Sequence, residues 1–589
     1  MPSVPGGAAE RGGDEAIVLQ GLSKSFAAGK RRIQALDGVS AAVGHGRVTG
    51  LIGPDGAGKT TMMRLIAGLL RPDAGRLQVL GMDVAEQPLE VQGVLRYMPQ
   101  RFGLYEDLTV QENLDLYADL QHVEPDARPP RYAELMHMTG LAPFTDRLAG
   151  HLSGGMKQKL GLACTLVRSP RLLLLDEPTA GVDPVSRREL WEIVYRQVND
   201  AGMSVLFSTA YLDEAERCDE VLLLHQGQLI GQGRPDEFSQ RLAGRTWQVP
   251  AAGTSRRSLQ QRLARRPDVL DATVQGDHVR LVMQEGASFG DGDDAGLKAE
   301  PVPPRFEDAF VAMLGTGDDL HGSEQDAPPA DAAQTHGTEA VIQVRGLSRN
   351  FGDFQAVKAI DFHVERGEVF GLLGANGAGK STTFRMLCGL LPASAGDLTV
   401  AGVNLRQAPA SARSRIGYMS QRFSLYGTLS VMDNLRFFSS AYGLSGSRRS
   451  ARIGWACTHF DLHDVAAMQA DDLPLGFKQR LAMACALLHE PDILFLDEPT
   501  SGVDPLARRE FWRRINTLAG QGVTVLVTTH FMEEAEYCDR LVIMAEGEIL
   551  AEGEPAAIKR EAADTGQPAT TMEDAFIALI QRQPQAASA

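Results

Sequence analysis

Three local patterns follow one another in the stretch EVFGLLGANGAGKSTTFRMLCGLL, residues 368–391. An apolar run predicts a buried strand, a glycine-rich loop comes next, and the segment after the loop has a helical pattern. The loop, GANGAGKST at 374–382, fits G-x-x-x-x-G-K-[ST], in which backbone N–H groups and the start of the following helix surround phosphate oxygens. Two further strand-like segments, DILFLDEP and VTVLVTTH, follow. This alternation predicts an α/β fold with a mainly parallel sheet.

The first part of the chain repeats this pattern. GPDGAGKTT at 53–61 matches the later loop at a spacing of 321 residues. From Gly202 and Gly522 onward the spacing is 320, so one residue was lost between the copies. A chain of 589 residues is also too long for one hydrophobic core. We therefore predict two domains of one fold, at 17–243 and 339–560.

The segments outside the two copies have patterns of their own. Residues 245–314 combine a strand-like TWQVP, a helical SRRSLQQRLARR and a hairpin expected to turn at Gln275–Gly276, which predicts a small α/β module. Two similar amphipathic segments, RFEDAFVAML at 305–314 and TMEDAFIALI at 571–580, are each expected to close one half as a helix. The other expected parts are a flexible tail at 1–16, a linker rich in Gly, Asp and Pro at 315–338, and a C-terminal helix and tail at 561–589.

Composition narrows the classes of partner. The net charge of −17 and the pI of about 5.3 argue against a nucleic-acid partner, which would favour a basic face. The six cysteines form no CxxC pair, so we expect no metal cluster and interpret them as small buried side chains in a reducing cytosol. The N-terminus has no apolar signal segment, and no apolar run approaches the ~18 residues of a membrane span. We expect other chains to supply any membrane part.

Charged and hydroxyl side chains after the predicted strands indicate phosphate chemistry. A lysine in each loop, Lys59 or Lys380, is placed to reach the β- and γ-phosphates of ATP. Two strands end in paired acids, RLLLLDEP at 171–178 and DILFLDEP at 492–499. The first acid of each pair would bind Mg²⁺, and the second would act on the attacking water as general base. The predicted residues are Thr60, Asp176, Ser381 and Asp497 for Mg²⁺, Glu177 and Glu498 as bases, and Gly53, Gly56, Gly58, Lys59, Thr60, Thr61, Gly374, Asn376, Gly377, Gly379, Lys380, Ser381 and Thr382 for ATP.

Other segments resemble a known family. LSGGMKQKL at 152–160 is similar to the signature loop of ABC-type ATPases, and Gln100 and Gln421 lie in segments that resemble the Q-loops of that family. AGVDP at 180–184 and SGVDP at 501–505 resemble its D-loops. The resemblance covers both repeats and implies two P-loop ABC-type ATPase domains in tandem, each with a mainly parallel core sheet and a helical subdomain. The GVDP, YLDEAE, FMEEAE and EDAF segments are most similar to tandem ATPase subunits of drug exporters.

The resemblance also implies roles for residues outside the phosphate loops. Two glutamines would contact Mg²⁺, one glutamine and one histidine would join the glutamates in catalysis, and the signature loops would contact ATP. Two aromatic rings occupy the place where the family commonly stacks a ring on adenine, although core packing explains each ring equally well. These residues are Gln100 and Gln421 for Mg²⁺, Gln421 and His530 for catalysis, Ser153, Gly154, Gly155 and Gly476 for ATP, and Phe26 and Phe351 for adenine.

The two copies differ at two of these places. VLFSTAYLDEAERCDE at 205–220 has Ala210 where VLVTTHFMEEAEYCDR at 525–540 has His530, and a methyl group cannot bond a phosphate. The signature-like loop of the second copy reads LPLGF at 473–477, where proline has neither a hydroxyl nor an N–H and leucine is too bulky for close approach.

The resemblance implies that the two halves pair head to tail, so that each ATP lies between the phosphate loop of one half and the signature loop of the other. Both differences then affect the ATP held by Lys59, whereas the ATP held by Lys380 keeps His530 and the intact signature loop. Our hypothesis is that the first site turns over slowly or acts as a nucleotide clamp, and that the second site drives the cycle. The alternative is that a neighbouring residue or water replaces the missing histidine.

Two functions fit the sequence. The favoured one is the energy-coupling subunit of a membrane exporter of drugs or other small molecules, peripheral on the cytoplasmic face of the inner membrane and docked on two separately encoded permease subunits. Docking is expected near 100–112 and 421–433, whose aromatic residues are equally compatible with core packing. The alternative is a soluble tandem ATPase acting on ribosomes. Residues 241–340, with 10 basic and 16 acidic side chains, disfavour RNA contact. The sequence does not identify the substrate, the permeases or the role of 245–314.

Overall fold

The computed structural model describes most of the chain as two compact units. The units are formed by residues 1–180 with 187–238 and by residues 181–186 with 239–589. The expected linker at 315–338 lies outside the described residues, as does most of the expected tail at 1–16. The described residues are 15–28, 31–100, 102–251, 255–289, 297–314, 340–405, 414–421, 423–503, 505–563 and 571–582.

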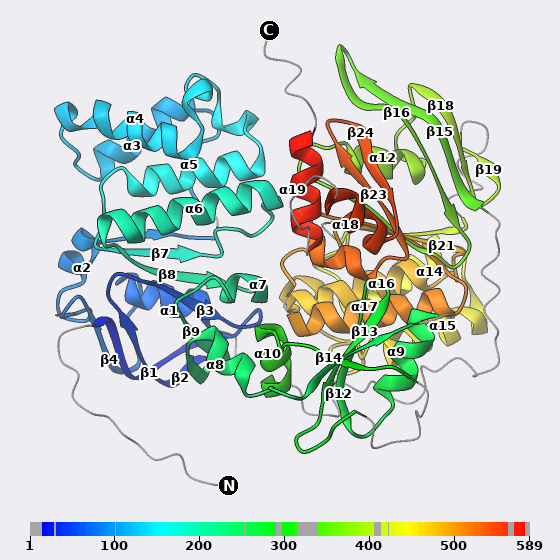
Figure 1. The fold of residues 1–589 in the computed structure, drawn as a ribbon, viewed down its shortest axis with the longest axis horizontal. Helices are drawn as coiled ribbons and strands as arrows, with labels where there is room; N and C mark the ends of the chain where they lie inside the picture. Colours follow the sequence, from blue (N-terminus) through cyan, green and yellow to red (C-terminus); the bar gives the residue numbers. More distant parts are fainter. Residues whose placement is uncertain are drawn as a thin grey trace. The chain divides into compact units, whose positions relative to one another are not determined.

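A six-stranded sheet forms the centre of the first unit (Figure 1). Its order is β10-β9-β3-β8-β7-β6, and only the edge strand β10 runs antiparallel to its neighbour. β3, β7 and β8 are buried at every position, which explains why their sequences are mostly apolar. The predicted mainly parallel sheet is therefore confirmed. The strands are β3 (Val48–Ile52), β6 (Leu95–Met98), β7 (Leu172–Asp176), β8 (Ser204–Thr209), β9 (Glu220–His225) and β10 (Gln228–Gly233).

A second, antiparallel sheet lies in the same unit and was not predicted from the sequence. Its order is β2-β1-β4-β5. Ile17, Leu19 and Leu22 of β1 are buried while other positions of the strand are exposed, so one face packs and the other meets solvent. Because β1 begins at Glu15, the first domain starts two residues before the expected boundary at 17. The strands are β1 (Glu15–Ala28), β2 (Arg31–Gly44), β4 (Ala74–Val79) and β5 (Met82–Asp83).

Helices cover the sheet and form the expected helical subdomain between β6 and β7. α3 and α4 of this subdomain both pack on α5. α3 begins with a capping box, in which Thr109 and Glu112 exchange hydrogen bonds. The helices of the unit are α1 (Lys59–Ile66), α2 (Pro88–Val94), α3 (Val110–Leu120), α4 (Arg128–Thr139), α5 (Gly154–Leu166), α6 (Pro184–Ala201), α7 (Leu212–Ala215) and α8 (Pro235–Gln240).

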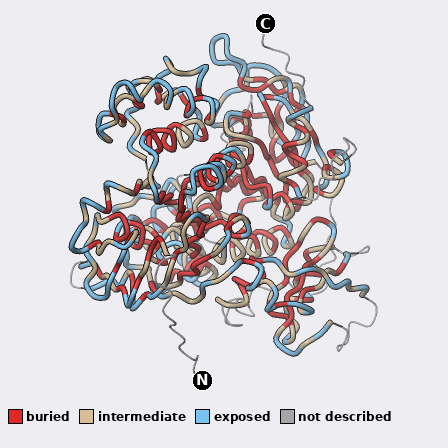
Figure 2. The backbone as a smooth tube through the Cα atoms, turned by 60° about the vertical axis from the view of Figure 1, so that its left-hand side comes forward, coloured by how far each residue is buried: buried red, intermediate tan, exposed pale blue. Residues whose placement is uncertain are grey.

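The second half repeats this architecture inside the second unit. Its two sheets have the orders β20-β21-β22-β17-β23-β24 and β16-β15-β18-β19. Figure 2 shows buried positions along the central strands and helices. The strands are β15 (Ala340–Phe351), β16 (Phe354–Glu365), β17 (Val369–Gly374), β18 (Ala395–Val400), β19 (Val403–Asn404), β20 (Ile416–Met419), β21 (Ile493–Asp497), β22 (Thr524–Thr529), β23 (Arg540–Ala545) and β24 (Glu548–Gly553). The helices are α12 (Lys380–Leu387), α14 (Val431–Ala441), α15 (Gly446–His459), α16 (Leu475–Leu487), α17 (Pro505–Gly520), η6 (Met532–Tyr537), α18 (Pro555–Ala563) and α19 (Met572–Arg582).

The segment 245–314 forms a small α/β module with its own sheet, ordered β12-β13-β11-β14. It belongs to the same compact unit as the second half. Its hairpin turns at Gly276–Asp277, one residue later than expected, because β12 continues to Gln275 and β13 starts at His278. The elements are β11 (Thr246–Pro250), α9 (Arg256–Ala264), β12 (Val269–Gln275), β13 (His278–Met283), β14 (Glu300–Pro301) and α10 (Phe306–Leu314).

The two EDAF segments form helices α10 and α19 at the expected residues. α10 falls in the same compact unit as the second half, which differs from the expectation that it closes the first half. α19 packs on α18 and η6 and so covers one edge of the second half, as predicted. Within the described residues, no helix is both long and apolar enough to cross a bilayer.

Candidate nucleotide-binding sites

Each phosphate loop connects a buried strand to a helix. The loop glycines Gly58 and Gly379 have φ angles of 105° and 97°, a region that favours glycine. A Cβ at Gly58 would lie 2.4 Å from the carbonyl oxygen of Ala35, so a larger residue would also displace the loop. The ammonium groups of Lys59 and Lys380 lie inside the loops and donate to the carbonyls of the first loop glycines, at 2.8 and 2.7 Å. The expected strand, loop and helix are present in both halves.

The first acid of each pair ends a central strand. Asp176 is almost fully buried at the end of β7 and accepts a hydrogen bond from Thr60 at 3.3 Å and from Ser208 at 2.7 Å. Asp497 ends β21 and accepts from Thr528 at 2.6 Å. Hydroxyl and carboxylate oxygens are the ligands that Mg²⁺ prefers, so this donor set fits the predicted ion in both halves.

The second acid of each pair has an unusual backbone conformation. Glu177 and Glu498 have φ angles of 48° and 46°, in the left-handed region that residues with a Cβ seldom adopt. The amide nitrogen of Gln100 donates to Glu177, and that of Gln421 donates to Glu498, both at 2.7 Å. The structure therefore brings each predicted glutamine to the predicted base of its own half.

The electrostatics of the second site favour an ionised Glu498. Burial acts to raise the pKa of Glu498, but the nearby side chains of His530 and Lys380 outweigh it and hold that pKa below its ordinary value. Burial lowers the pKa of the Lys380 ammonium, with the charge of Glu498 opposing. Burial also raises the pKa of Asp497. An ionised glutamate can accept a proton from water, as a general base must.

The two halves differ beside this glutamate. His530 is buried, and its Nδ1 lies 3.2 Å from Glu498 without the alignment of a hydrogen bond. Neither ring nitrogen of His530 has a hydrogen-bond partner within the described residues. A buried polar group without a partner costs about 1–3 kcal/mol, so the ring fits a ligand that would occupy the site. In the first half the equivalent position is Ala210, and Lys59 pairs with Glu177 at 3.2 Å.

The signature loops differ in the way that they start their helices. Ser153 is the N-cap of α5, and its hydroxyl accepts from the N–H of Met156 at 3.3 Å. Pro474 occupies the same place before α16 and provides no side-chain cap. Each loop starts a helix of the helical subdomain, whereas the lysine, glutamine and acids gather at the ends of the central strands.

The two rings expected to stack on adenine are not part of the core. Phe26 is 40% exposed and Phe351 is 47% exposed. A cation lies over each ring, Lys24 at 5.7 Å and Arg349 at 4.6 Å. Core packing therefore does not explain either ring. Because both rings are exposed, each is accessible for stacking on an adenine ring.

Three residues that hold the buried aspartates were not predicted from the sequence. Ser208 and Thr528 come near the ends of β8 and β22 and donate to Asp176 and Asp497. Tyr97 in β6 also donates to Asp176, at 3.0 Å. The hydroxyl residues in the otherwise apolar strands LFST and VTT were the available signal, because a polar group inside a buried strand needs a partner.

Comparison with known proteins agrees with this geometry. The ABC transporter family matches residues 36–180 and 357–501. A probable multidrug ABC transporter ATP-binding protein of Escherichia coli K12, YbhF, is 51% identical over 96% of this chain and 98% of its own length. A Nod factor export ATP-binding protein of Cupriavidus pinatubonensis is 41% identical over 41% of this chain and 74% of its own length. A linearmycin resistance ATP-binding protein of Bacillus subtilis is 38% identical over 36% of this chain and 69% of its own length.

The matched segments contain both phosphate loops and both pairs of acids, and the long match extends through the module between the two halves. This chain therefore belongs to the ABC transporter family, and its two repeats are ATP-binding domains of an ATPase of that family.

Proposed function

We propose that the chain uses ATP hydrolysis to drive export of drugs or other small molecules, with one fully equipped site and one degenerate site. The observation that carries the division of labour is the contrast between the two halves at two positions. His530 and the Ser153 cap have Ala210 and Pro474 as their counterparts, while the lysines, glutamines and acids are alike. The relative that matches nearly the whole chain is named as a multidrug transporter protein, which supports the exporter.

The proposed sites combine residues of both halves. Site one takes its phosphate loop from the first half and its signature loop, 473–477, from the second. Site two takes its phosphate loop from the second half and its signature loop, 152–156, from the first. Both substitutions then affect site one. Site one would contain Lys59, Thr60, Gln100, Asp176, Glu177 and Ala210, and site two would contain Lys380, Ser381, Gln421, Asp497, Glu498 and His530.

The residues of site two have distinct proposed roles toward ATP and Mg²⁺. Ser381, Asp497 and Gln421 would hold Mg²⁺, which supplies charge neutralisation on the phosphate oxygens when bound. Lys380 and the loop N–H groups would bind the β- and γ-phosphates. Glu498, held by Gln421 at 2.7 Å, would orient the attacking water and accept its proton. The Nε2 of His530, which has no hydrogen-bond partner within the described residues, would donate to a γ-phosphate oxygen.

Site one would bind ATP but hydrolyse it slowly. It keeps the lysine, the Mg²⁺ ligands and Glu177. It lacks two donors to the γ-phosphate, each worth about 1.5–3 kcal/mol when charge-assisted. Loss of one preorganised donor typically lowers a rate by roughly 10²–10³. A nucleotide that stays bound at site one would hold the halves together while site two turns over.

We further propose that two separately encoded permease subunits complete the transporter and place this chain at the cytoplasmic face of the inner membrane. Exposed aromatic residues follow each Q-loop glutamine, with Tyr105 56% exposed and Tyr426 47% exposed. Phe437, packed edge-on against Tyr426 at 4.5 Å, is also exposed. In contrast, Phe102 and Phe423 are partly buried, so core packing accounts for these two rings. The tyrosines and Phe437 supply an apolar surface for a permease segment.

The alternative, a ribosome-acting ATPase, has less support. The relatives described above carry the names of transporter, export or resistance proteins. Fractionation of cells that contain the protein separates the two functions. Recovery with membranes, dependent on permease subunits, is the expected result, and sedimentation with ribosomes would contradict it.

The division of labour is tested by matched substitutions in the full chain. Glu498→Gln keeps the size of the side chain but removes the base, so turnover should fall by roughly 10²–10³. Glu177→Gln should lower turnover by no more than about threefold, because site one contributes little flux. Steady-state ATPase rates measure both, and a fluorescent ATP analogue checks that binding persists. Equal losses in the two variants would refute the proposal.

A further inference from the structure

The module at 245–314 is fastened to the second half by a pair of arginines at the start of α9. Arg256 bonds Asp539 at 2.8 Å, and Arg257 pairs with the other oxygen of the same carboxylate. Arg257 also donates to the carbonyl of Gly367 at 3.1 Å. Arg257 is buried, and this carboxylate is the partner that a buried guanidinium requires.

Asp539 is itself part of the frame of the nucleotide site. Its Oδ2 accepts the N–H of Val369 at 2.8 Å, and Val369 is the first residue of β17. β17 leads directly into the phosphate loop at 374–382. The arginines therefore attach the module to the strand that carries this loop.

A second attachment holds α17, the helix that begins at the end of the SGVDP segment. Arg509, in the second turn of α17, is almost buried and pairs with two acids of the module, Asp271 of β12 and Glu307 of α10. The distance to Glu307 is 2.9 Å. Further along α17, the amide of Asn516 donates to Gln260 of α9 at 3.3 Å, with both residues buried.

A third contact reaches η6, the short helix that follows His530. β12 of the module packs against η6. Trp512 of α17 stacks on Tyr537 of η6, with ring centroids 4.9 Å apart. The module thus contacts α17 and η6 directly and is linked to β17 through Asp539. Each of these three elements adjoins a segment predicted to belong to the nucleotide site of the same half.

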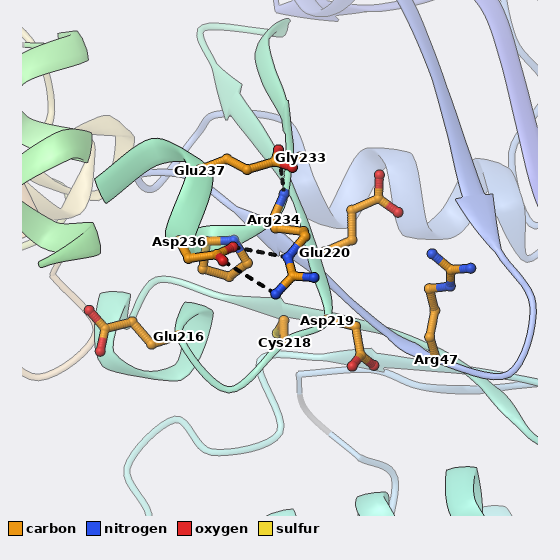
Figure 3. A pocket seen from close by; sticks show the side chains of 10 residues that line it. Arg47, Glu216, Cys218, Asp219, Glu220, Gly233, Arg234, Asp236 and Glu237 are labelled. Carbon is orange, nitrogen blue, oxygen red and sulfur yellow. Dashed lines mark hydrogen bonds and ion pairs between the residues drawn. The ribbon is translucent and has the colours of Figure 1, made fainter. Parts of the chain in front are cut away.

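The first half has the same acid but a different environment around it. Asp219, the counterpart of Asp539, also accepts the N–H of its strand, that of Val48, at 2.9 Å. Asp219 is exposed in an open pocket of about 670 Å³ that is lined by first-half residues (Figure 3). Arg234 in this pocket pairs with Asp236 at 3.0 Å.

We propose that the module is an internal brace that positions the phosphate loop, the SGVDP segment and His530 of the second half relative to one another. Asp539 and Arg509 are its positioning residues. The proposal rests on the proposed function, because it assigns the brace to the half with the complete catalytic set. Phosphoryl transfer depends on positioning, and a displacement of about 1 Å can lower a rate by roughly 10². The half that hydrolyses quickly therefore gains most from a brace.

The test uses the full chain and replaces a carboxylate by an amide of the same shape. Asp539→Asn and Asp271→Asn each weaken one attachment. The matched control is Asp219→Asn, which changes the equivalent acid of the first half, where it accepts the N–H of Val48. Both Asp539→Asn and Asp271→Asn should lower kcat by about 10-fold with KM for ATP changed by less than about twofold. Asp219→Asn should leave kcat within about twofold of the wild type.

Hydrogen exchange gives a direct reading of the brace and does not depend on activity. In Asp539→Asn and Asp271→Asn, amides at 506–516 and 532–537 should exchange faster, while those of α6 should not. Asp271→Glu keeps the negative charge that Asp271→Asn removes, so this variant should retain most of the wild-type kcat. Arg257→Gln, which removes the buried charge instead of isolating it, serves as a second disruption if an aspartate variant folds poorly.

Epistasis separates failure of the brace from failure of the proposed function. In a Glu498→Gln background, Asp271→Asn should cause no further loss, because the site that it positions is already inactive. If Asp271→Asn lowered the residual kcat of Glu498→Gln by the same factor as in the wild type, its effect would lie outside that site. This result would contradict the proposal that the module acts as a brace. Unchanged kcat and exchange in Asp539→Asn, Asp271→Asn and Arg257→Gln would also overturn it. Equal losses in Glu498→Gln and Glu177→Gln would instead refute the division of labour.

Discussion

The two halves share a scaffold and differ in what surrounds it. Both have a central sheet of the same order, a glutamine bonded to a glutamate at 2.7 Å, and an aspartate that ends a buried strand. In the second half a histidine lies beside the glutamate and the module packs against the helix that follows the SGVDP segment, whereas the first half has Ala210 at the position of this histidine. Duplicated folds can therefore keep their ligand-binding frame while donors to the reacting phosphate change.

The largest effect is expected at His530. His530→Ala gives the second half the residue of the first, and removal of this donor should lower kcat by roughly 10²–10³. Ala210→Ser, a control change at the equivalent position of the first half, should alter kcat by less than about twofold, because Glu177 contributes little turnover. Steady-state ATPase assays at saturating ATP measure both. A His530→Ala enzyme with nearly normal kcat would show that the halves are functionally alike despite this difference.

An intermediate effect is expected from Glu368, whose counterpart in the first half is Arg47. Burial raises the pKa of Glu368 from 4.5 to about 7. The folded state then binds the proton more tightly than the unfolded state, so this carboxyl stabilises the fold less as pH rises from about 4.5 to 7. Glu368→Gln should flatten that decline in melting temperature.

The matched control for this pH experiment is Arg47→Gln, which should leave the slope of melting temperature against pH unchanged. An identical slope in the wild type and in Glu368→Gln would contradict the assignment. Glu368 directly precedes β17, in the second half. The experiment therefore also shows whether unfolding of the second half limits the stability of the chain.

The smallest effect concerns the helix caps at the two signature loops. Ser153→Ala removes the cap of α5 and should cost about 1 kcal/mol of stability. Pro474→Ser adds a capping hydroxyl before α16 and should raise stability by up to about 1 kcal/mol. Thermal unfolding measures both. Ser153→Ala should also lower ATPase activity by about 10-fold, since its hydroxyl is the proposed contact to ATP, and Pro474→Ser should not lower it.

Much of the fold followed from local pattern. The buried strands at 172–176 and 493–497 were readable because both faces are covered, which produces continuous apolar sequence. The antiparallel sheet was missed because β1 alternates buried and exposed positions with several irregularities of register, a weaker signal over 14 residues. The hairpin turn at Gly276–Asp277 was displaced by one residue, as turn boundaries are set by pairing that the sequence does not display.

The site was predicted where a side chain has an obligatory spacing from the phosphate loop. Lys59, Asp176 and Glu177 gather as expected, and so do their counterparts. Tyr97 and Ser208 were not predicted, because they act by hydrogen bonding to the aspartate and are far from it in sequence. The attachment of the module through Arg257 and Arg509 was equally invisible, since single charges on a helix usually face solvent. The predicted roles toward ATP and Mg²⁺ stay predictions.

The six free cysteines of the chain are all buried. Burial also raises the pKa of Cys164 and Cys538, which leaves little reactive thiolate in the folded chain. A thiol-alkylating reagent should therefore modify the cysteines of a half only while local unfolding of that half exposes them. Cys164 and Cys218 report on the first half, and Cys388, Cys457, Cys485 and Cys538 report on the second. Peptide mapping of the alkylation would then time the opening of each half separately, without any added probe.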